Sequence, residues 1–272
     1  MTKICFIGGG NMATSLIGGL IAQGQAADSI CVSDPNQDQL DKLAKDFSVK
    51  TESDNIKAVA DADLIMLAVK PQVMKQVIEP IADAIPQSAL IVSIAAGINL
   101  YSFEKWLGKE RAIVRCMPNT PALIQLGASG LYANGNTSDE QKKLAEEVLS
   151  AAGIVQWVEH EKDIDAVTAV SGSGPAYYFL LMEAMIDAGV ELGLSRETAA
   201  ELTVQTAVGA AQMAKQSDVD AAELRRRVTS PGGTTEQAIN TFEGAHLRDI
   251  VKAALKSAND RSGELAAMLG EK

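Results

Sequence analysis

The chain has 272 residues, of which 24 are Lys or Arg and 35 are Asp or Glu, so its formal net charge is −11. Hydrophobic residues make up 47% and charged residues 22%, a composition that supports a sizeable core and excludes global disorder. The acidic balance argues against duplex nucleic acid as a partner, because neutralising its phosphates requires a basic face. A small anionic ligand is not excluded, since loops and helix N-termini can bind one locally.

The sequence also argues against a disulfide-rich, metal-binding, secreted or membrane-spanning protein. Three cysteines and two histidines are too few and too scattered to predict a disulfide framework or a metal site. Residues 1–7 are typical of a first strand and not of a signal peptide. The longest apolar runs, such as residues 64–69, are far shorter than the ~20 residues that span a bilayer. We therefore expect a soluble, reduced, cytoplasmic protein without a metal or a membrane partner.

In the first part of the chain, short apolar runs alternate with longer amphipathic stretches. This alternation favours βαβ units and a doubly wound, largely parallel α/β sheet with helices on both faces. The expected strands are residues 4–7, 30–33, 64–69, 90–94, 113–117 and 154–158. The expected helices between them are residues 11–23, 37–46, 73–84, 100–106 and 139–151.

The second part has no convincing strands and is rich in Ala, Leu, Glu and Met. The expected helices are residues 177–193, 196–215, 235–241 and 247–268. We predict an α/β domain over residues 1–160 and an all-α domain over residues 161–272. The all-α domain is expected to form a homodimer, because it has more apolar residues than a small helical lobe can cover. Examples are Tyr178, Leu181, Met182, Met185 and Ile186.

The sequence Gly8-Gly9-Gly10-Asn11-Met12-Ala13 follows the first strand and opens the first helix. In this G-x-G-x-x-A pattern Gly8 permits a tight turn, Gly10 lets a pyrophosphate approach the backbone, and Ala13 allows close packing of helix and strand. The pattern predicts a Rossmann domain that binds a dinucleotide at a helix N-terminus. The alternative is a purely structural glycine turn.

Asp34 follows the second strand, where the adenosine ribose is expected. An acidic residue there accepts a hydrogen bond from the ribose 2′-hydroxyl and favours NAD, because it repels a 2′-phosphate. The alternative is an N-cap or an Asx turn before Pro35.

Two further loops follow strand ends, the edge at which open α/β sheets bind ligands. They are residues 68–71 and 93–97, whose small side chains leave room for a cofactor, and Lys70 can face a phosphate. Alternatively, small residues simply close the sheet edge. The loop at residues 115–121 is compatible with holding a carboxamide or with serving as a rigid turn.

Two segments rich in glycine and hydroxyl groups interrupt the helical half, at residues 171–175 and 228–235. The second precedes a helix, so its N–H groups and hydroxyls would form a neutral cradle for a carboxylate. The alternative is helix capping by Ser or Thr. Arg225–Arg227 is interpreted as a solvated helix face or as an offset for bound anions. Because no Ser-His-Asp signature is present, the chemistry is expected to come from a cofactor.

Six motifs, in this order, resemble the pyrroline-5-carboxylate reductase family. They are GGGNMA, LAVKP, SIAAG, MPNTP, AVSGSGPAY and VTSPGGTT, and the resemblance runs from about Lys3 to Leu265. It implies a Rossmann domain followed by a helical domain that dimerises, with dimers sometimes assembling further. It also implies NADPH- or NADH-dependent hydride transfer to C5 of 1-pyrroline-5-carboxylate, giving L-proline in the last step of proline biosynthesis.

The resemblance also implies which residues form the site. The pyrophosphate of the cofactor would contact Gly8, Gly10, Asn11 and Met12, and its adenosine end would contact Ser33, Asp34 and Asn55. The cleft would be lined by Ala68, Val69, Lys70 and Pro71, and the nicotinamide would lie beside Ala95, Ala96 and Gly97. The substrate would contact Glu161, Ser171, Gly172, Ser173, Gly174, Ser230, Gly233, Thr234 and Thr235, with Thr235 as the catalytic residue. Asp34 departs from members that prefer NADPH, which tend to carry neutral or basic groups in this region.

A protonated cyclic imine is already an electrophile, so positioning of the two reactants is the expected main contribution of the protein. Two alternatives stay open at this point. One is a related reductase acting on another imine or on a 2-hydroxy acid; the hydroxy-acid enzymes generally place a lysine in the first helical stretch, where this chain has only Lys162. The other is a dinucleotide-binding regulatory protein without catalysis.

Overall fold

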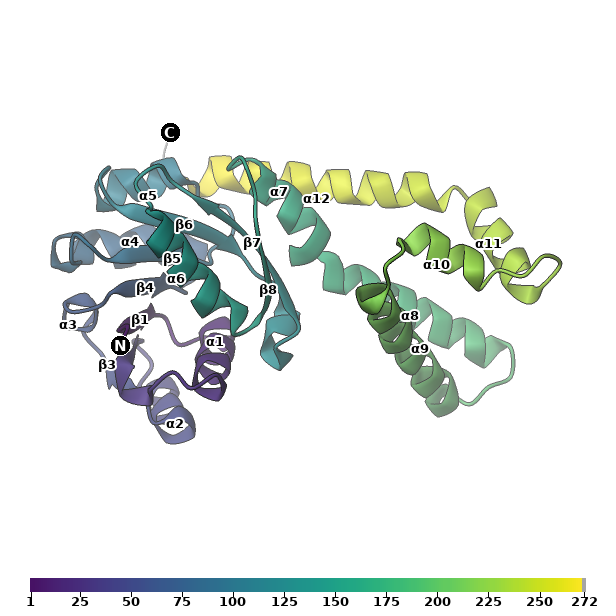
Figure 1. The fold of residues 1–272 in the computed structure, drawn as a ribbon, viewed down its shortest axis with the longest axis horizontal. Coiled ribbons are helices and arrows are strands. Elements are labelled where there is room, and N and C mark those ends of the chain that lie inside the picture. The colour runs from purple at the N-terminus through teal and green to yellow at the C-terminus, as the bar shows by residue number, and fades with distance from the viewer. Residues whose placement is uncertain (271–272) are drawn as a thin grey trace. The chain divides into compact units, whose positions relative to one another are not determined.

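The computed structural model describes residues 1–270, and within them one mixed sheet has the order β3-β2-β1-β4-β5-β6-β7-β8 (Figure 1). Strands β1 to β6 are parallel, β7 runs antiparallel to β6, and β8 is parallel to β7. The strands are β1 (Ile4–Ile7), β2 (Ile30–Ser33), β3 (Lys50–Glu52), β4 (Leu64–Leu67), β5 (Leu90–Ser93), β6 (Ala112–Met117), β7 (Gly127–Ala133) and β8 (Gly153–Trp157). The order of the first six strands is that of a doubly wound dinucleotide-binding sheet.

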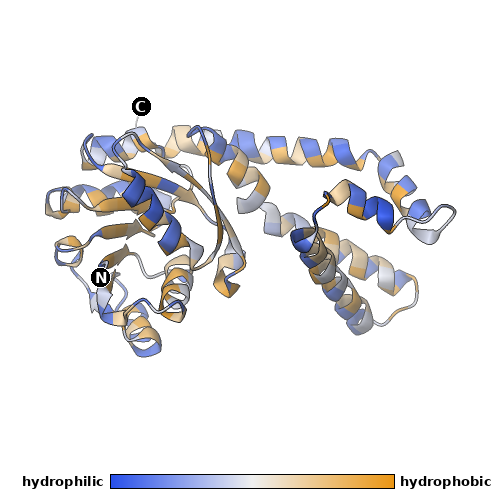
Figure 2. Cartoon of the chain, viewed as in Figure 1, coloured by the Kyte–Doolittle hydropathy of each residue, from blue (hydrophilic) through white to orange (hydrophobic). Residues whose placement is uncertain are grey.

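Helices cover both faces of this sheet. They are α1 (Asn11–Ala22), α2 (Gln37–Phe47), α3 (Asn55–Val59), α4 (Met74–Ile78), α5 (Leu100–Leu107), α6 (Asp139–Ser150) and α7 (Asp163–Val167). Alternate side chains of one strand enter opposite cores: Met66 of β4 packs with α1, α2 and α6, and its neighbour Ile65 packs with α3, α4 and α5. Burial on both faces explains why the inner strands are continuously apolar, as the orange strands in Figure 2 show.

The largely parallel sheet is confirmed, but two of its strands were not predicted. Strand β3 has the sequence Lys-Thr-Glu, and polar residues suit an exposed edge strand without producing an apolar run. Strand β7 is built largely of Gly, Ala and Ser, so it lacks the bulky residues that identify a strand in the sequence. Its glycines permit close packing, because a Cβ atom on Gly130 would lie 2.6 Å from the Val167 side chain.

Contacts divide the described chain into two compact units. The Rossmann unit comprises Met1–Ser173 and the residues from Ser257 onward, and the helical unit comprises Gly174–Lys256. Helix α12 (Leu247–Leu269) therefore contributes residues to both units. The other helices of the helical unit are α8 (Gly174–Glu191), α9 (Arg196–Gln216), α10 (Ala221–Arg227) and α11 (Thr234–Gly244). The predicted boundary between residues 160 and 161 does not coincide with this division and stays a prediction.

In the helical unit, helix α8 exposes apolar side chains around its whole circumference. The consecutive residues Tyr178, Phe179, Leu180 and Leu181 are each exposed by half or more, from 50% to 67%. Successive helical residues point about 100° apart, so four in a row cannot be covered by one neighbouring helix. Helix α9 packs closely at one position, where a Cβ atom on Gly189 would lie 3.1 Å from the Cβ atom of Ala199. An exposed apolar surface of this kind is typical of an interaction site.

None of the helices within residues 1–270 combines the length and the apolar character that a membrane crossing needs.

Candidate functional site

Helix α1 begins directly after the glycine turn that ends β1. Gly8 has a φ angle of +102°, and a Cβ atom there would lie 2.7 Å from the Ala68 carbonyl oxygen, so only glycine fits. Gly10 caps α1 without a side-chain hydrogen bond, and a Cβ atom there would meet nothing within 4 Å. The first N–H groups of α1 thus have no capping side chain, and open space lies beside Gly10. This arrangement fits the pyrophosphate of a dinucleotide.

The predicted cofactor loops leave the sheet at one edge. Ile7 is in register with Ser33 and with Leu67, and Leu67 is in register with Ser93. These four residues end β1, β2, β4 and β5, so the segments that follow them lie along the carboxyl edge of the parallel strands. Those segments contain the predicted cofactor residues Gly8, Gly10, Asn11, Met12, Asp34, Ala68, Val69, Lys70, Pro71, Ala95, Ala96 and Gly97.

Asp34 holds the glycine turn through its carboxylate. Its Oδ2 accepts a hydrogen bond from the Gly9 N–H at 2.8 Å, and its Oδ1 accepts one from the Asn36 N–H at 2.9 Å. The Asx-turn interpretation is therefore confirmed. The N-cap interpretation is wrong, because Asn36 caps α2 by accepting from the N–H groups of Asp38 and Gln39. Contact of Asp34 with an adenosine ribose stays a prediction.

Ser33 and Asn55 lie together at the adenosine end of the predicted site. The Ser33 hydroxyl, which is buried, donates to Asn55 Oδ1 at 2.6 Å and joins the end of β2 to the first residue of α3. Lys70 is exposed, directly before the short 3₁₀ turn that begins at Pro71. The structure thus brings the residues predicted for the adenosine end close together and leaves the Lys70 ammonium accessible to an anion.

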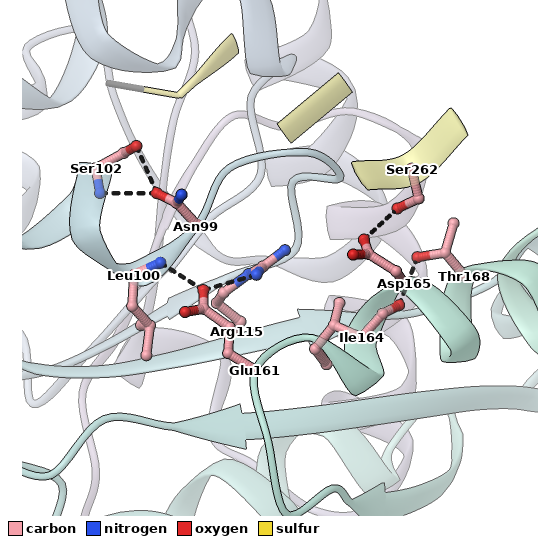
Figure 3. A network of polar contacts seen from close by, with 9 residues as sticks. All are labelled: Asn99, Leu100, Ser102, Arg115, Glu161, Ile164, Asp165, Thr168 and Ser262. Atoms are coloured by element: carbon pink, nitrogen blue, oxygen red, sulfur yellow. Dashed lines mark hydrogen bonds and ion pairs between the residues drawn. The ribbon is translucent and has the colours of Figure 1, made fainter. Parts of the chain in front are cut away.

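Glu161, which was predicted to border the substrate, makes two polar contacts within the Rossmann unit (Figure 3). Its Oε1 accepts a hydrogen bond from the Leu100 N–H at 2.6 Å and pairs with Arg115 Nη1 at 2.7 Å. Arg115 lies on β6 and is 7% exposed. Arg115 had no predicted role of its own, although a charged residue in an otherwise buried strand was itself a signal.

The first glycine- and serine-rich segment begins within a π-helical turn (Thr168–Gly172) that lies between α7 and α8. Such turns are rare and frequently occur at functional sites. Asn119 fixes it by donating from Nδ2 to the Ser171 carbonyl oxygen at 3.0 Å, and its Oδ1 accepts from the Ala128 N–H at 2.9 Å. These contacts favour the rigid-turn interpretation of the loop at residues 115–121. A Cβ atom on Gly172 would lie 2.6 Å from Met117 Cε, so a larger residue here would require the flexible Met117 side chain to shift.

The predicted substrate residues Ser171 and Gly172 belong to this turn, Ser173 directly follows it, and Gly174 begins α8. The remaining ones, Ser230, Gly233, Thr234 and Thr235, lie in the helical unit at the start of α11.

In the helical unit, Gly233 caps α11, and no side chain makes a capping hydrogen bond there. Capping of α11 by Ser or Thr, the alternative interpretation, is therefore wrong. Glu236 accepts from the Gly232 N–H at 2.8 Å and so fixes the turn before the helix. Thr235, in the first turn of α11, is half-buried. The N–H groups of this first turn have no intrahelical partner, which suits a carboxylate ligand.

The three consecutive arginines on α10 pair with carboxylates of the same unit. Arg226 and Arg227 bind Glu223 at 2.7 Å and 2.9 Å, and Arg225 lies 3.4 Å from Glu243. Hydrogen bonds from Arg226 and Arg227 lower the pKa of the Glu223 carboxyl to about 2. These pairs favour the interpretation of the run as a solvated helix face.

Within residues 1–270, no group of three or more His, Cys, Asp or Glu side chains is placed to hold a metal ion.

A doubly wound sheet, a glycine turn that leaves room for a pyrophosphate, and an all-helical partner unit define a dinucleotide-dependent oxidoreductase. Residues 3–97 match the family model described as "NADP oxidoreductase coenzyme F420-dependent", and residues 161–265 match "Pyrroline-5-carboxylate reductase dimerisation". A pyrroline-5-carboxylate reductase of Pseudomonas aeruginosa is 59% identical over 99% of this chain and 98% of the relative. The chain belongs to the pyrroline-5-carboxylate reductase family.

Solved structures of pyrroline-5-carboxylate reductases match the fold of this chain over nearly its whole length. A pyrroline-5-carboxylate reductase from Coxiella burnetii has a TM-score of 0.95 and 46% identity, covering 97% of this chain and 98% of that one. A Plasmodium falciparum pyrroline carboxylate reductase with NADP bound has a TM-score of 0.85 and 32% identity, with the same coverage. The predicted family, fold class and NADP-binding domain are thus confirmed.

Proposed function

We propose that this chain reduces 1-pyrroline-5-carboxylate to L-proline, with the Rossmann unit binding the cofactor and the start of α11 binding the substrate. The observation that carries the assignment of the two binding sites is that two helices of different units begin without a capping side chain. Gly10 precedes α1, and Gly233 precedes α11. One helix N-terminus is suited to the cofactor pyrophosphate and the other to the substrate carboxylate.

The residues of the Rossmann unit hold and orient the cofactor. The N–H groups at Gly10, Asn11 and Met12 bind its pyrophosphate, and Ser33, Asp34 and Asn55 contact its adenosine end. Ala68, Val69, Lys70 and Pro71 line the cleft, and Ala95, Ala96 and Gly97 lie beside its nicotinamide. When bound, the nicotinamide supplies the hydride.

The residues at the start of α11 hold the substrate. The N–H groups of Gly233, Thr234 and Thr235, together with the Ser230 hydroxyl, bind its carboxylate, and the Thr235 hydroxyl holds the ring nitrogen. The turn from Ser171 to Gly174 borders the substrate. A protonated imine needs little further activation, so these residues contribute mainly by positioning it.

A homodimer is the working form in this proposal, since residues 161–265 match a dimerisation model and α8 exposes apolar residues on all sides. We further propose a cytoplasmic setting, because that compartment keeps thiols reduced. Cys5 and Cys31 lie in register on neighbouring strands and are both free thiols.

The Thr235→Ala variant tests this proposal. Loss of one hydrogen bond to a charged partner costs about 1.5–3 kcal/mol, which lowers kcat/KM with pyrroline-5-carboxylate roughly 10- to 150-fold. Affinity for NAD(P)H should be nearly unchanged, because the cofactor residues lie in the other unit. On the same variant, kcat/KM is measured by steady-state kinetics, NADPH affinity by calorimetric titration and stability by a melting curve.

Thr241→Ala is the matched control. The Thr241 hydroxyl donates to the Gln237 carbonyl oxygen at 3.1 Å within the same helix. This variant therefore removes a threonine hydroxyl from α11 at a position away from the N-terminus. A Thr235→Ala enzyme with wild-type kcat/KM and a depressed melting temperature would refute the assignment of Thr235 to catalysis.

A further inference from the structure

The loop that connects β5 to α5, residues 94–99, contains Ala95–Gly97 and is fixed near both ends by side chains outside it. At its start the Ala95 N–H donates to the hydroxyl oxygen of Ser93 at 3.2 Å, and Ser93 is 1% exposed. At its end the N–H of Leu100, the first residue of α5, donates to Glu161 Oε1 at 2.6 Å. The loop therefore has a defined path between a strand end and a helix start.

The Glu161 carboxylate is itself held by a buried cation. Arg115 Nη1 lies 2.7 Å from the same oxygen, Oε1, that accepts from Leu100 (Figure 3). The Arg115 side chain is 8% exposed, and Arg115 is in register with Ser93 on the neighbouring strand. A buried guanidinium needs a paired carboxylate, so the position of Glu161 is determined by the sheet. A carboxylate at the N-terminus of α5 is also favoured by the helix dipole.

The end of α12 contacts the same loop. Gly97 has a φ angle of +73°, and a Cβ atom there would lie 3.4 Å from Leu265 Cβ and from Leu269 Cδ1. The hydroxyl of Ser262, on the same part of α12, donates to Asp165 Oδ1 of α7 at 2.6 Å. These contacts all lie within the Rossmann unit. They leave the loop little freedom to move away from the sheet edge.

We propose that Arg115 and Glu161 are positioning residues that set the loop Ala95–Gly97 for the nicotinamide half of the cofactor. They act through the Leu100 N–H and the start of α5, and neither is a catalytic residue. This inference rests on the proposed function, in which the loop lies beside the nicotinamide. It gives Glu161 a different role from the substrate contact that the family resemblance implied.

The test measures cofactor binding separately from turnover, using the full chain with Glu161→Ala. Calorimetric titration compares NADPH with 2′-phospho-ADP-ribose, which lacks the nicotinamide. A misplaced loop should weaken NADPH binding about 10-fold and binding of the fragment less than about twofold, because only NADPH reaches the loop. The kcat value should fall by about 10- to 100-fold, and the primary deuterium isotope effect on kcat with 4-deuterated NADPH should rise.

Further variants separate the positioning role from general damage. Glu161→Gln keeps an acceptor for the Leu100 N–H, so it should lose less NADPH affinity and kcat than Glu161→Ala. If the alanine variant does not fold, the same measurements on Glu161→Gln test the role of Glu161. Glu159→Ala, which removes an exposed carboxylate two residues away, should behave as wild type. The double variant Arg115→Met/Glu161→Ala should lose no more NADPH affinity and kcat than the more impaired of the two single variants, because both residues act through one contact.

Two results would overturn the proposal. Equal weakening of NADPH and of the fragment would mean that Glu161 stabilises the unit as a whole. An unchanged NADPH affinity with a raised KM for pyrroline-5-carboxylate would return Glu161 to the substrate. If the wild-type protein binds NADPH but does not reduce pyrroline-5-carboxylate, the proposed function fails, and the comparison of NADPH with its fragment still decides the role of Glu161.

Discussion

In the Rossmann unit helices on both faces bury the apolar side chains of the sheet, whereas in the helical unit most apolar side chains of α8 and α9 are exposed. Among the described residues of Gly174–Lys256, Ala199 is the one hydrophobic side chain that is buried. The first unit therefore obtains its stability from its own core, whereas the exposed apolar surface of the second is typical of an interface. Substitutions in the two units should therefore affect different properties of the protein.

A charge on the exposed apolar surface of α8 should have the largest effect. Leu181→Asp would place a carboxylate in the proposed dimer interface at a cost of about 3 kcal/mol or more, which should weaken the dimer at least about 100-fold. Light scattering should change from twice the 28.6 kDa of one chain towards the mass of one chain. Tyr101→Asp, at an exposed position on α5 of the Rossmann unit, serves as the control. An unchanged mass for Leu181→Asp would place the interface elsewhere.

The glycines of the Rossmann unit should separate stability from cofactor binding. Gly8→Ala forces a side chain into a positive-φ position and against the Ala68 carbonyl oxygen, which should cost about 1–3 kcal/mol of stability. Gly10→Ala meets open space and should leave the melting temperature unchanged. Its methyl group should weaken NADPH binding about 10-fold, or about 1.4 kcal/mol. Melting curves and calorimetric titration test the pair, and normal NADPH affinity in Gly10→Ala would contradict the pyrophosphate assignment.

Asp34 should influence which dinucleotide is preferred. Asp34→Asn removes a negative charge near the expected 2′-phosphate and keeps one oxygen to accept a hydrogen bond. Because a partly exposed charge interaction is worth about 1 kcal/mol, the ratio of kcat/KM for NADPH to that for NADH should rise about fivefold. The wild-type enzyme is expected to accept both cofactors. An unchanged ratio would make Asp34 only a support for the glycine turn.

The smallest effect is expected from the arginine run of the helical unit. The pKa of Glu223 is lowered to about 2 by hydrogen bonds from Arg226 and Arg227, compared with its usual 4.5. A lowered pKa in the folded state stabilises the protein above the usual value, and this contribution is lost as the pH falls from 4.5 towards 2. Glu223→Gln should therefore be slightly less stable than wild type at pH 7, with a difference that shrinks on acidification. Urea unfolding at several pH values measures it, and a constant difference would show that the pairs are not responsible.

Much of the fold was predictable because its signals are local. The apolar runs of β1, β2, β4, β5 and β6 reflect burial on both faces, and the glycine pattern after β1 reflects a turn that tolerates no side chain at Gly8. The order of motifs along the chain likewise identified the family. The polar edge strand β3 and the small-residue strand β7 carry no such local signal and were missed.

The contacts around the candidate site were not predictable to the same degree, because they join residues far apart in the sequence. Asp34 bonds to Gly9 across 25 positions, Arg115 to Glu161 across 46, and Leu100 to Glu161 across 61. A single sequence shows that a carboxylate is present but not which N–H or guanidinium it meets. Asn119 is a similar case: its amide was compatible with a ligand contact, and in the structure it bonds to the π-helical turn and to strand β7.

The sequence by itself determined which segments form the parallel sheet, where the dinucleotide turn lies and which family the chain resembles. Those features depend on side-chain periodicity and on the conformational freedom of individual glycines, which are properties of short segments. Only the tertiary structure decided that Asp34 supports the glycine turn, that α11 starts without a capping side chain, and that Arg115 and Glu161 fix the start of α5. The contacts of Asp34, Arg115 and Glu161 depend on strand order and register, which bring distant residues to one edge of the sheet.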